Sequence, residues 1–522
     1  MIIPFLFTLD EFGRQKPTYL WTFYKFMNFG KKYQYPIIAQ EKFFGDLEDE
    51  NIGHGARSEN SFFTFEYDLP SGEQLAINKE YCITEEEQKR IINEYNSIEE
   101  AWIDLLKKEN DNLIEILREK IKNIEKKHGE KVEAIFSWIW LPSVKKVANE
   151  MGISCIFYEF STIRRPIYNC SLGYFQFCDK YDSTYVVNDF CEFKKNRCFL
   201  LNRRELLGLF LDKDHIQYLK YLYDEPDYRV GYALGLYNDK FEKAFSKYTA
   251  TEVFEKLKHL YNKDEVLVRP HPQMDSNLEF DFPIDKSPDS SQWISRCETI
   301  ISNLSNVAYE AMLYGRKNIN IFKGLPSSFG EASSLDYIVE KSYSIEELNF
   351  LTFYCYAPYE LMFDRDYIRW RLSKPSILEI YEYNLKYELK RHNIDFDNMK
   401  SLEENERFKY ILKNAQNIDD TKVDEYIHDS RLKRAKEDAN EFQKITNQNE
   451  NLEEIVKKLR ADNTELWEEI QKQNKTIESI GLENTELRAA MEEINKSRVW
   501  KLRNKMKKML KKWNFVFHFF LV

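Results

Sequence analysis

Short apolar segments alternate with helical patterns in two stretches of the chain. In the first stretch, Ala134–Ile139 and Ser154–Tyr158 have the composition of buried strands, and Gly152 closes the helix predicted between them. This spacing is typical of a βαβ crossover, in which the two strands run parallel. A long charged helical pattern precedes it over residues 83–127, with a break predicted near Asn96-Ser97.

The second stretch follows a polar linker near residues 223–226. Strands and helices alternate in it. The predicted strands are Arg229–Leu236, Glu265–Val268, Thr299–Ile301 and Asn318–Phe322, and the predicted helices are Ser290–Ser295 and Val307–Tyr314. Alternating strands and helices of this kind indicate an α/β fold. We therefore predict two Rossmann-type α/β domains facing a cleft, residues 1–225 and 226–345, followed by a helical region, 346–431, that packs on both.

From residue 432 to 497 the period of the apolar positions changes to seven. The apolar residues of this repeat are Ile445, Leu452, Leu459, Leu466, Ile480, Leu487 and Ile494, and asparagines interrupt the second core position at 449, 463 and 484. Such heptads predict a coiled coil, most often a parallel homodimer, with a trimer left open.

Charge separates the last segment, residues 498–522, from the rest of the chain. The net charge is −11, but this segment carries eight Lys or Arg and no acid, so the remaining residues carry −19. Val499, Trp500 and Leu502 begin an apolar series that interleaves with the basic residues. We predict an amphipathic helix lying on an anionic membrane surface, with a disordered basic tail as the alternative. The acidic body argues against nucleic-acid binding.

Composition places the protein in the cytoplasm. The eight cysteines form no C-x-x-C pair, so neither a zinc site nor a disulfide framework is expected. The apolar start, Met1 to Phe7, is too short for a signal peptide, and no apolar run is long enough to span a bilayer. With the basic tail, this predicts a peripheral protein on the inner face of the cytoplasmic membrane.

Polar residues cluster where successive strands of the second stretch end. The first group is Arg269, His271 and Pro272, and the second is Ser302, Asn303, Ser305 and Asn306 at the start of a helix. Ligands of parallel α/β sheets bind at these strand ends, and helix starts suit phosphate oxygens. The pattern predicts a nucleotide-binding site, with His271 held between two prolines. In the simpler alternative the prolines only stop a strand and Ser302 only caps a helix.

Carboxylates follow two other strands. Glu159 comes at the end of the strand Ser154–Tyr158, and Asp239 follows Arg229–Leu236. Across a nucleotide-sugar cleft, one carboxylate can serve as a general base and another as a nucleophile. Either residue could instead cap a helix or form an ion pair.

These motifs together resemble bacterial glycosyltransferases of GT-B fold that use CMP-activated sugars, in particular the β-Kdo transferases of capsule and O-antigen synthesis. The resemblance covers roughly residues 130 to 325 and rests on Arg-Pro-His-Pro, Ser302-x-x-Ser305 and the loop after Tyr158. It implies that His271 and the serines bind the CMP phosphate without a metal, and that Glu159 is the acid/base. Asp239 aligns with a proposed nucleophile, but Tyr237 and Asn238 stand where acidic residues are expected.

The resemblance also implies the reaction. We expect transfer of Kdo from CMP-Kdo to a lipid-linked glycan, with Arg164 and Arg165 binding substrate and no cofactor required. Other donors, namely CDP-glycerol, CMP-sialate or a UDP-sugar, stay open, as does a non-catalytic membrane scaffold. The sequence does not specify the acceptor, the linkage or the stereochemical outcome.

Overall fold

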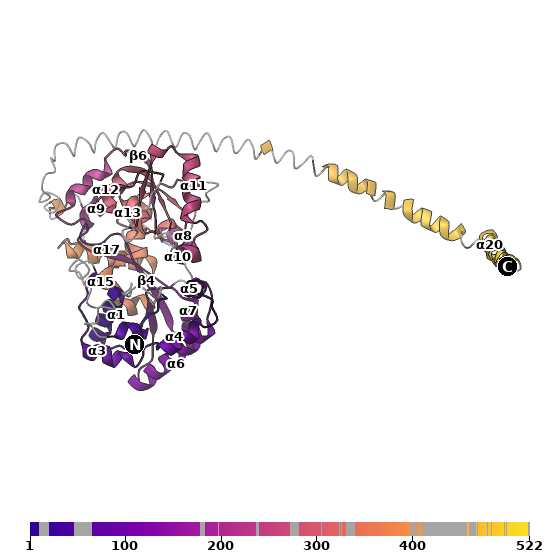
Figure 1. The fold of residues 1–522 in the computed structure, drawn as a ribbon. Helices are drawn as coiled ribbons and strands as arrows, with labels where there is room; N and C mark the ends of the chain where they lie inside the picture. The colour runs from indigo at the N-terminus through magenta and orange to yellow at the C-terminus, as the bar shows by residue number, and fades with distance from the viewer. Residues whose placement is uncertain are drawn as a thin grey trace. The chain divides into compact units, whose positions relative to one another are not determined.

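The computed structural model describes most of the chain. The described residues are 1–9, 20–45, 65–177, 183–196, 198–235, 240–271, 281–303, 305–322, 324, 326–329, 340–396, a few between 402 and 409, 457–458 and most of 466–519. Residues Met1–Asp420 form one compact unit and Thr421–Val522 a second. Two β-sheets organise the first unit (Figure 1).

The first sheet has six strands in the order β10-β5-β4-β3-β1-β2. Strands β2, β1, β3 and β4 run parallel, whereas β5 is antiparallel to both of its neighbours. The strand bounds are Ile2–Leu6 (β1), Ile38–Ala39 (β2), Ala134–Ser137 (β3), Ser154–Phe160 (β4), Leu172–Gln176 (β5) and Tyr356–Pro358 (β10). The predicted βαβ crossover is confirmed: α7 (Pro142–Met151) joins β3 to β4, and Gly152 ends it in the left-handed conformation.

Six helices accompany this sheet. They are α1 (Leu20–Tyr33), α3 (Gly72–Lys79), α4 (Glu85–Ile92), α5 (Ile98–Lys107), α6 (Asp111–His128) and α7. The charged stretch 83–127 is broken at Ser97, close to the predicted place, but the prediction of one break was wrong. A second break lies at Asn110, whose side chain accepts a hydrogen bond from Leu113 N and so starts a new helix.

The second sheet has four parallel strands in the order β7-β6-β8-β9. Its strands are Tyr228–Ala233 (β6), Val266–Arg269 (β7), Cys297–Ser302 (β8) and Lys317–Asn320 (β9), and its helices are α10 (Lys240–Phe245), α11 (Ala250–Leu260), α12 (Ser290–Ser295) and α13 (Val307–Leu313). All four predicted strands are present, with ends shifted by one to three residues. The mixed α/β class is thereby confirmed.

The cores of the first unit do not follow the predicted boundary at residue 225. Side chains from Ile163 to Leu222 share one hydrophobic core with Trp293 and Tyr309 of the second sheet's helices. These side chains come from the segment after β4, from β5, and from α8 (Thr184–Phe193), α9 (Arg203–Phe210) and η3 (Ile216–Leu222). A glycine makes close packing possible here, because a Cβ on Gly231 of β6 would lie 2.8 Å from Trp293.

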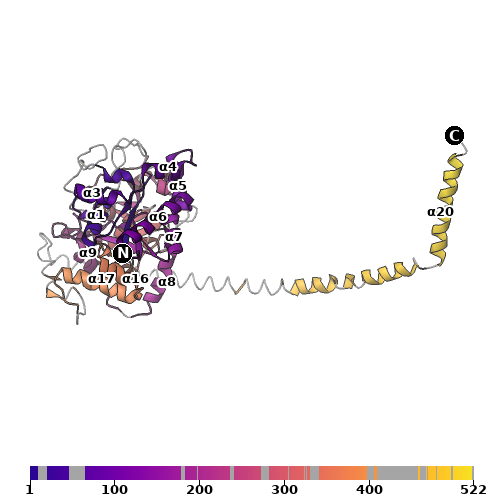
Figure 2. The same cartoon turned by 90° about the horizontal axis from the view of Figure 1, so that it is seen from below.

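The segment after the second sheet returns to the first. It contains α14 (Ile345–Phe350), the π-helical turn η6 (Leu351–Cys355), β10, α15 (Tyr359–Met362), α16 (Arg365–Leu372) and α17 (Ile377–Arg391). The expectation of a purely helical region was wrong, since β10 pairs with β5 and extends the first sheet. Helices α16 and α17 are labelled next to each other in Figure 2. Trp370 of α16 stacks on Tyr383 of α17, with ring centroids 4.7 Å apart.

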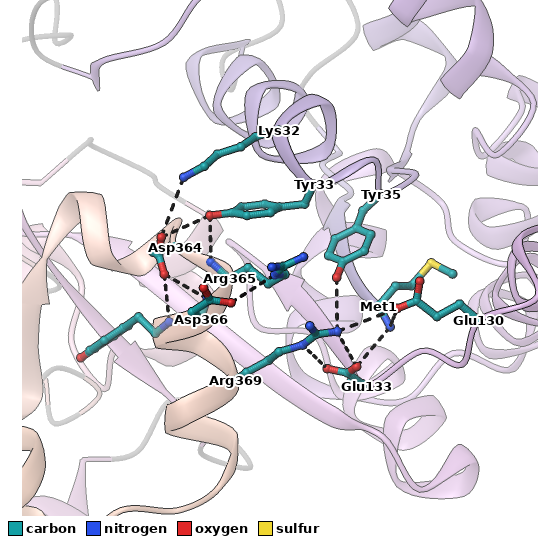
Figure 3. Close-up of polar contacts among 11 residues, drawn as sticks. Met1, Lys32, Tyr33, Tyr35, Glu130, Glu133, Asp364, Arg365, Asp366 and Arg369 are labelled. Atoms are coloured by element: carbon teal, nitrogen blue, oxygen red, sulfur yellow. Dashed lines mark hydrogen bonds and ion pairs between the residues drawn. The ribbon is translucent and has the colours of Figure 1, made fainter.

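Polar contacts hold α16 against the first sheet and α1 (Figure 3). Arg369 of α16 donates to Glu133 at 2.7 and 2.9 Å, ahead of β3. At the start of the same helix, the hydroxyl of Tyr33 donates to Asp364 at 3.3 Å and accepts from Arg365 N at 3.1 Å. These contacts therefore hold the returning segment to the first sheet and to α1.

The second unit contains the C-terminal helices. Residues 468–477 and 483–494 are helical, and α20 spans Arg498–Phe519. Among the described residues of this single chain, the apolar heptad positions Leu466, Ile477 and Leu487 are exposed. None of the described helices combines the length and apolar character needed to cross a membrane.

Candidate active site

The carboxyl ends of the two sheets meet through Asn306. Its Nδ2 donates to the carbonyl of Phe160 at 2.8 Å, its Oδ1 accepts from the Tyr356 hydroxyl at 3.1 Å, and its own carbonyl accepts from Thr162 Oγ1 at 3.2 Å. Asn306 precedes α13 in the second sheet's half, and the other three residues belong to β4, its following loop and β10. The carboxyl ends of β4 and β8 are thus adjacent.

Glu159 lies near the end of β4, directly beside this junction. Its Oε1 accepts hydrogen bonds from Trp138 Nε1 at 3.1 Å and from Phe160 N at 2.7 Å. Burial raises the pKa of Glu159 to about 7, although these two hydrogen bonds and the charge of Arg164 act to lower it. The carboxyl group therefore changes protonation state near neutral pH, which is the property that general acid–base catalysis requires.

The neighbouring arginines have different surroundings. Arg165 forms an ion pair with Glu66, and its Nε donates to the carbonyl of Asn169 at 3.4 Å. Arg164 is exposed, and within the described residues no hydrogen bond or ion pair engages it. Protein around Arg164 nevertheless lowers the pKa of its guanidinium, while the charges of Glu310 and Glu159 raise it. Arg164 thus presents an unengaged cation next to Glu159.

Arg269 and His271 of the predicted Arg-Pro-His-Pro group have different surroundings in the structure. Arg269 ends β7, and its guanidinium forms an ion pair with the buried carboxylate of Asp285 and donates to the carbonyl of Ser287 at 3.2 Å. His271 is half-buried, and burial together with the charge of Arg164 lowers its pKa. At neutral pH it is therefore a neutral imidazole that can donate one hydrogen bond. Pro272 lies outside the described residues.

The predicted phosphate turn contains one side chain with spare capacity. Ser302 Oγ donates to Asn320 Oδ1 at 3.0 Å, and Ser305 Oγ accepts from Val307 N at 3.3 Å, so both serines have partners. Asn303 is 5% exposed; its Nδ2 donates to Glu242 at 3.2 Å, and its Oδ1 has no hydrogen-bond partner among the residues that the structure describes. A buried acceptor without a partner is costly, and a bound hydroxyl or amino group would satisfy it.

The simpler reading of Ser302 as a helix cap was wrong, since its hydroxyl bonds to β9. Asp239 lies outside the described residues, so its position next to the site is not described. Its predicted partner across the sheets, Glu159, is described in full.

The sequence analysis did not identify two residues near the candidate site. Trp138 follows β3 and orients Glu159, as described above. Glu310 is fully buried in α13 and accepts from Ser290 Oγ, Ser291 Oγ and the Tyr168 hydroxyl, each at 2.7 to 2.8 Å. An acid in the apolar helix Val307–Leu313 was a visible signal that a buried network would be needed to accommodate it.

Comparison with known proteins gives the class of this site. Residues 4–184 match the model of the Glycosyltransferase 99 family N-terminal domain. The protein is accordingly a glycosyltransferase, and its matched segment contains β1 to β5 with Glu159, Arg164 and Arg165. The curated proteins contain no match to this chain.

Solved structures with partial likeness include two sugar transferases and an epimerase. The β-Kdo 2,7 transferase of KpsC from Thermosulfurimonas dismutans has 17% identity over 44% of this chain and 79% of its own, with a TM-score of 0.29. The β-Kdo 2,4 transferase of the same protein has 13% identity over 42% of this chain and 78% of its own, with a TM-score of 0.26. UDP-GlcNAc 2-epimerase of Methanocaldococcus jannaschii has 10% identity over 63% of this chain and 85% of its own, with a TM-score of 0.24. At these values the likenesses carry no argument about donor or acceptor.

Proposed function

We propose that this glycosyltransferase has a GT-B architecture and transfers Kdo from CMP-Kdo to a growing cell-surface polysaccharide, of capsule or O-antigen type. The observation that carries the proposal is the pair formed by Glu159 and Arg164. A carboxyl group with a pKa of about 7 lies beside an unengaged guanidinium, where the carboxyl ends of two sheets adjoin. Both residues lie within the segment that matches the glycosyltransferase family model, which supports the proposal.

The guanidinium favours a donor whose sugar is an acid. A guanidinium binds a carboxylate through two parallel hydrogen bonds, and Arg164 has its donors available for such a contact. Kdo and sialate carry a carboxylate on the sugar, whereas common UDP-sugars and CDP-glycerol do not. We assign the phosphate and ribose of CMP to the second sheet's side of the site. There the His271 imidazole can donate a hydrogen bond and Asn303 Oδ1 can accept one.

The proposed chemistry uses two carboxylates. Asp239, the proposed nucleophile, attacks the anomeric carbon of Kdo; the carbon–oxygen bond to the phosphate breaks, and CMP leaves with the bonding electrons. The acceptor hydroxyl then attacks the same carbon, the bond to Asp239 breaks, and Glu159 accepts the hydroxyl proton. This sequence leaves the anomeric configuration unchanged. No metal takes part in it.

Membrane attachment is a separate part of the proposal. On α20, Val499, Leu502 and Met509 are exposed alongside the basic residues, which supports a helix lying on an anionic surface. The exposed heptad residues of the preceding helices support pairing with a second copy through a coiled coil. A dimer attached in this way on the cytoplasmic face would meet lipid-linked acceptors.

A donor screen tests the proposal. The full-length protein is mixed with labelled CMP-Kdo, CMP-sialate, UDP-sugars or CDP-glycerol in the presence of EDTA and a membrane fraction carrying lipid-linked glycan. We expect transfer of label from CMP-Kdo. Transfer from an uncharged UDP-sugar with none from CMP-Kdo would refute the donor assignment, and a requirement for a divalent cation would refute the metal-free mechanism.

A further inference from the structure

Aromatic side chains from four separate segments converge at the carboxyl end of the first sheet. Trp21 comes from α1, Phe65 precedes α3, Trp138 follows β3 and Phe160 ends β4. The ring of Trp21 stacks on Phe65 with centroids 4.4 Å apart, and it meets Trp138 and Phe160 edge to face at 5.4 and 5.2 Å. Trp21, Phe65 and Trp138 are each partly exposed, so the cluster is not closed off as a core.

The aromatic cluster is continuous with the catalytic carboxyl group. Trp138 donates its indole N–H to Glu159 at 3.1 Å, and Phe160 is the next residue along the chain. A molecule resting on the exposed part of Trp21 or Trp138 would therefore lie next to the group that is proposed to take a proton. Trp138 is hydrogen-bonded to Glu159, and the ring of Trp21 contacts that of Trp138.

The charges bordering the cluster already have partners. Lys25 Nζ donates to the carbonyl of Glu66 at 2.8 Å and lies 4.7 Å from the ring centroid of Tyr359. Arg165 is paired with the carboxylate of Glu66. With both cations occupied, the partly exposed rings of Trp21 and Trp138 provide apolar surface beside the carboxyl group of Glu159. That combination suits an uncharged sugar ring, which offers C–H groups on its face and hydroxyls at its edge.

We propose that Trp21 and Trp138 form a subsite for the acceptor, stacking the apolar face of its terminal neutral sugar so that a ring hydroxyl reaches Glu159. The inference rests on the proposed function for the role of Glu159 and for the assignment of the donor to Arg164, His271 and Asn303.

Binding of simple sugars tests the subsite without relying on transfer. Saturation-transfer NMR is recorded on the full-length protein with methyl β-glucoside, methyl β-galactoside and methyl β-N-acetylglucosaminide as probes. We expect saturation of the axial ring protons for at least one probe. Trp21→Ala should reduce it by about five- to ten-fold, since an aromatic contact contributes about 0.5–1.5 kcal/mol beyond its buried area.

Two further variants separate stacking from folding and from positioning. Trp370→Ala removes a stacked tryptophan from α16, away from the cluster, and should leave the saturation unchanged. Trp138→Phe keeps a ring but removes the N–H that lowers the pKa of Glu159, so probe binding should persist while the pH dependence of turnover moves to higher pH. If Trp21→Ala unfolds, Trp21→Phe should retain saturation and Trp21→Leu should lose it.

Three results would overturn the subsite: no saturation of any probe in the wild-type protein, equal saturation in the wild-type protein and a folded Trp21→Ala or Trp21→Leu variant, or an equal loss in Trp370→Ala. A failure of the proposed donor chemistry is distinguishable from these. In that case the probes would still bind through Trp21, and CMP-Kdo would not be consumed.

Discussion

At the scale of single residues, Glu159 determines how the reaction depends on pH. Glu159→Gln should retain donor binding and lower turnover by about two to four orders of magnitude, because a positioned base contributes about 10²–10⁴-fold. Wild-type turnover should fall as the pH drops below about 7, since only the ionised carboxylate accepts a proton. Initial rates of CMP release between pH 5 and 9 check both statements. A wild-type rate in the variant would exclude this role.

Thermal unfolding of the same variant provides the control. The folded-state pKa of Glu159 is raised from 4.5 to about 7, so ionisation costs the folded protein free energy that accumulates between these two pH values. Glutamine carries no such cost. The Tm of Glu159→Gln should therefore equal that of the wild type near pH 4.5 and exceed it at pH 8, and a lower Tm at pH 8 would contradict the burial of the charge.

Arg164 and His271 are expected to contact different halves of the donor. His271→Ala should weaken binding of CMP itself by more than about ten-fold, the effect of losing a hydrogen bond to a charged group. Arg164→Ala should leave CMP binding within about two-fold and weaken CMP-Kdo by more than ten-fold. Calorimetry with both ligands and EDTA measures this, with Arg369→Lys, whose partner Glu133 precedes β3, as the control. Equal loss of CMP binding in both variants would assign Arg164 to the phosphate instead.

The sequence could place Glu159 and His271 at strand ends because strands can be predicted from apolar runs. Glu159 lies near the end of β4 and His271 follows β7, and the charge of Arg164 acts on the pKa of both. Contacts between distant segments could not be predicted in this way. Asn306 was expected to bind phosphate, yet its side chain bonds to Phe160 and Tyr356, and the Trp138–Glu159 bond depends on a register that only the folded sheet defines.

At the scale of elements, the position of Glu159 depends on close packing by β5. A Cβ on Gly173 would lie 2.7 Å from the carbonyl oxygen of Glu159 and 2.7 Å from Met362 Sδ. Gly173→Ala should therefore destabilise the fold by about 1–3 kcal/mol and reduce turnover by moving β4. Chemical denaturation and CMP-release rates measure the two effects.

Gly72→Ala is the matched control, because nothing lies within 4 Å of a Cβ at that position in α3. It should leave stability and turnover unchanged or raise stability slightly. Equal behaviour of the two alanine variants would show that β5 does not constrain Glu159.

The strands of the two sheets differ in how well the sequence predicts them. The parallel strands β3, β4, β6, β7, β8 and β9 were foreseen because each is a compact apolar run between helices. Strands β1, β2, β5 and β10 were missed. β10 has three residues, Tyr356–Pro358, and follows a helical turn directly, so its strand character comes from pairing with β5 and not from a local pattern.

At the scale of the whole molecule, the C-terminal unit is expected to attach the enzyme to its substrate membrane. A parallel coil would place two tails of eight basic residues each on one surface, and linked weak anchors bind far more tightly than one. Removing residues 498–522 should abolish sedimentation with anionic liposomes while the protein remains dimeric and releases CMP from donor. Leu466→Pro with Leu487→Pro should give monomers whose binding is weaker and more sensitive to salt. Unchanged sedimentation without the tail would exclude the anchor.

The transfer reaction itself is tested most directly by the mass of the peptide that contains Asp239. The Glu159→Gln variant is incubated with CMP-Kdo and digested, and its peptides are analysed by mass spectrometry. If Asp239 is the nucleophile and Glu159 the base for the acceptor, one Kdo residue should accumulate on the peptide that contains Asp239, and Asp239→Ala should prevent it. An unmodified protein after CMP-Kdo has been consumed, or a sugar on a different peptide, would contradict the mechanism.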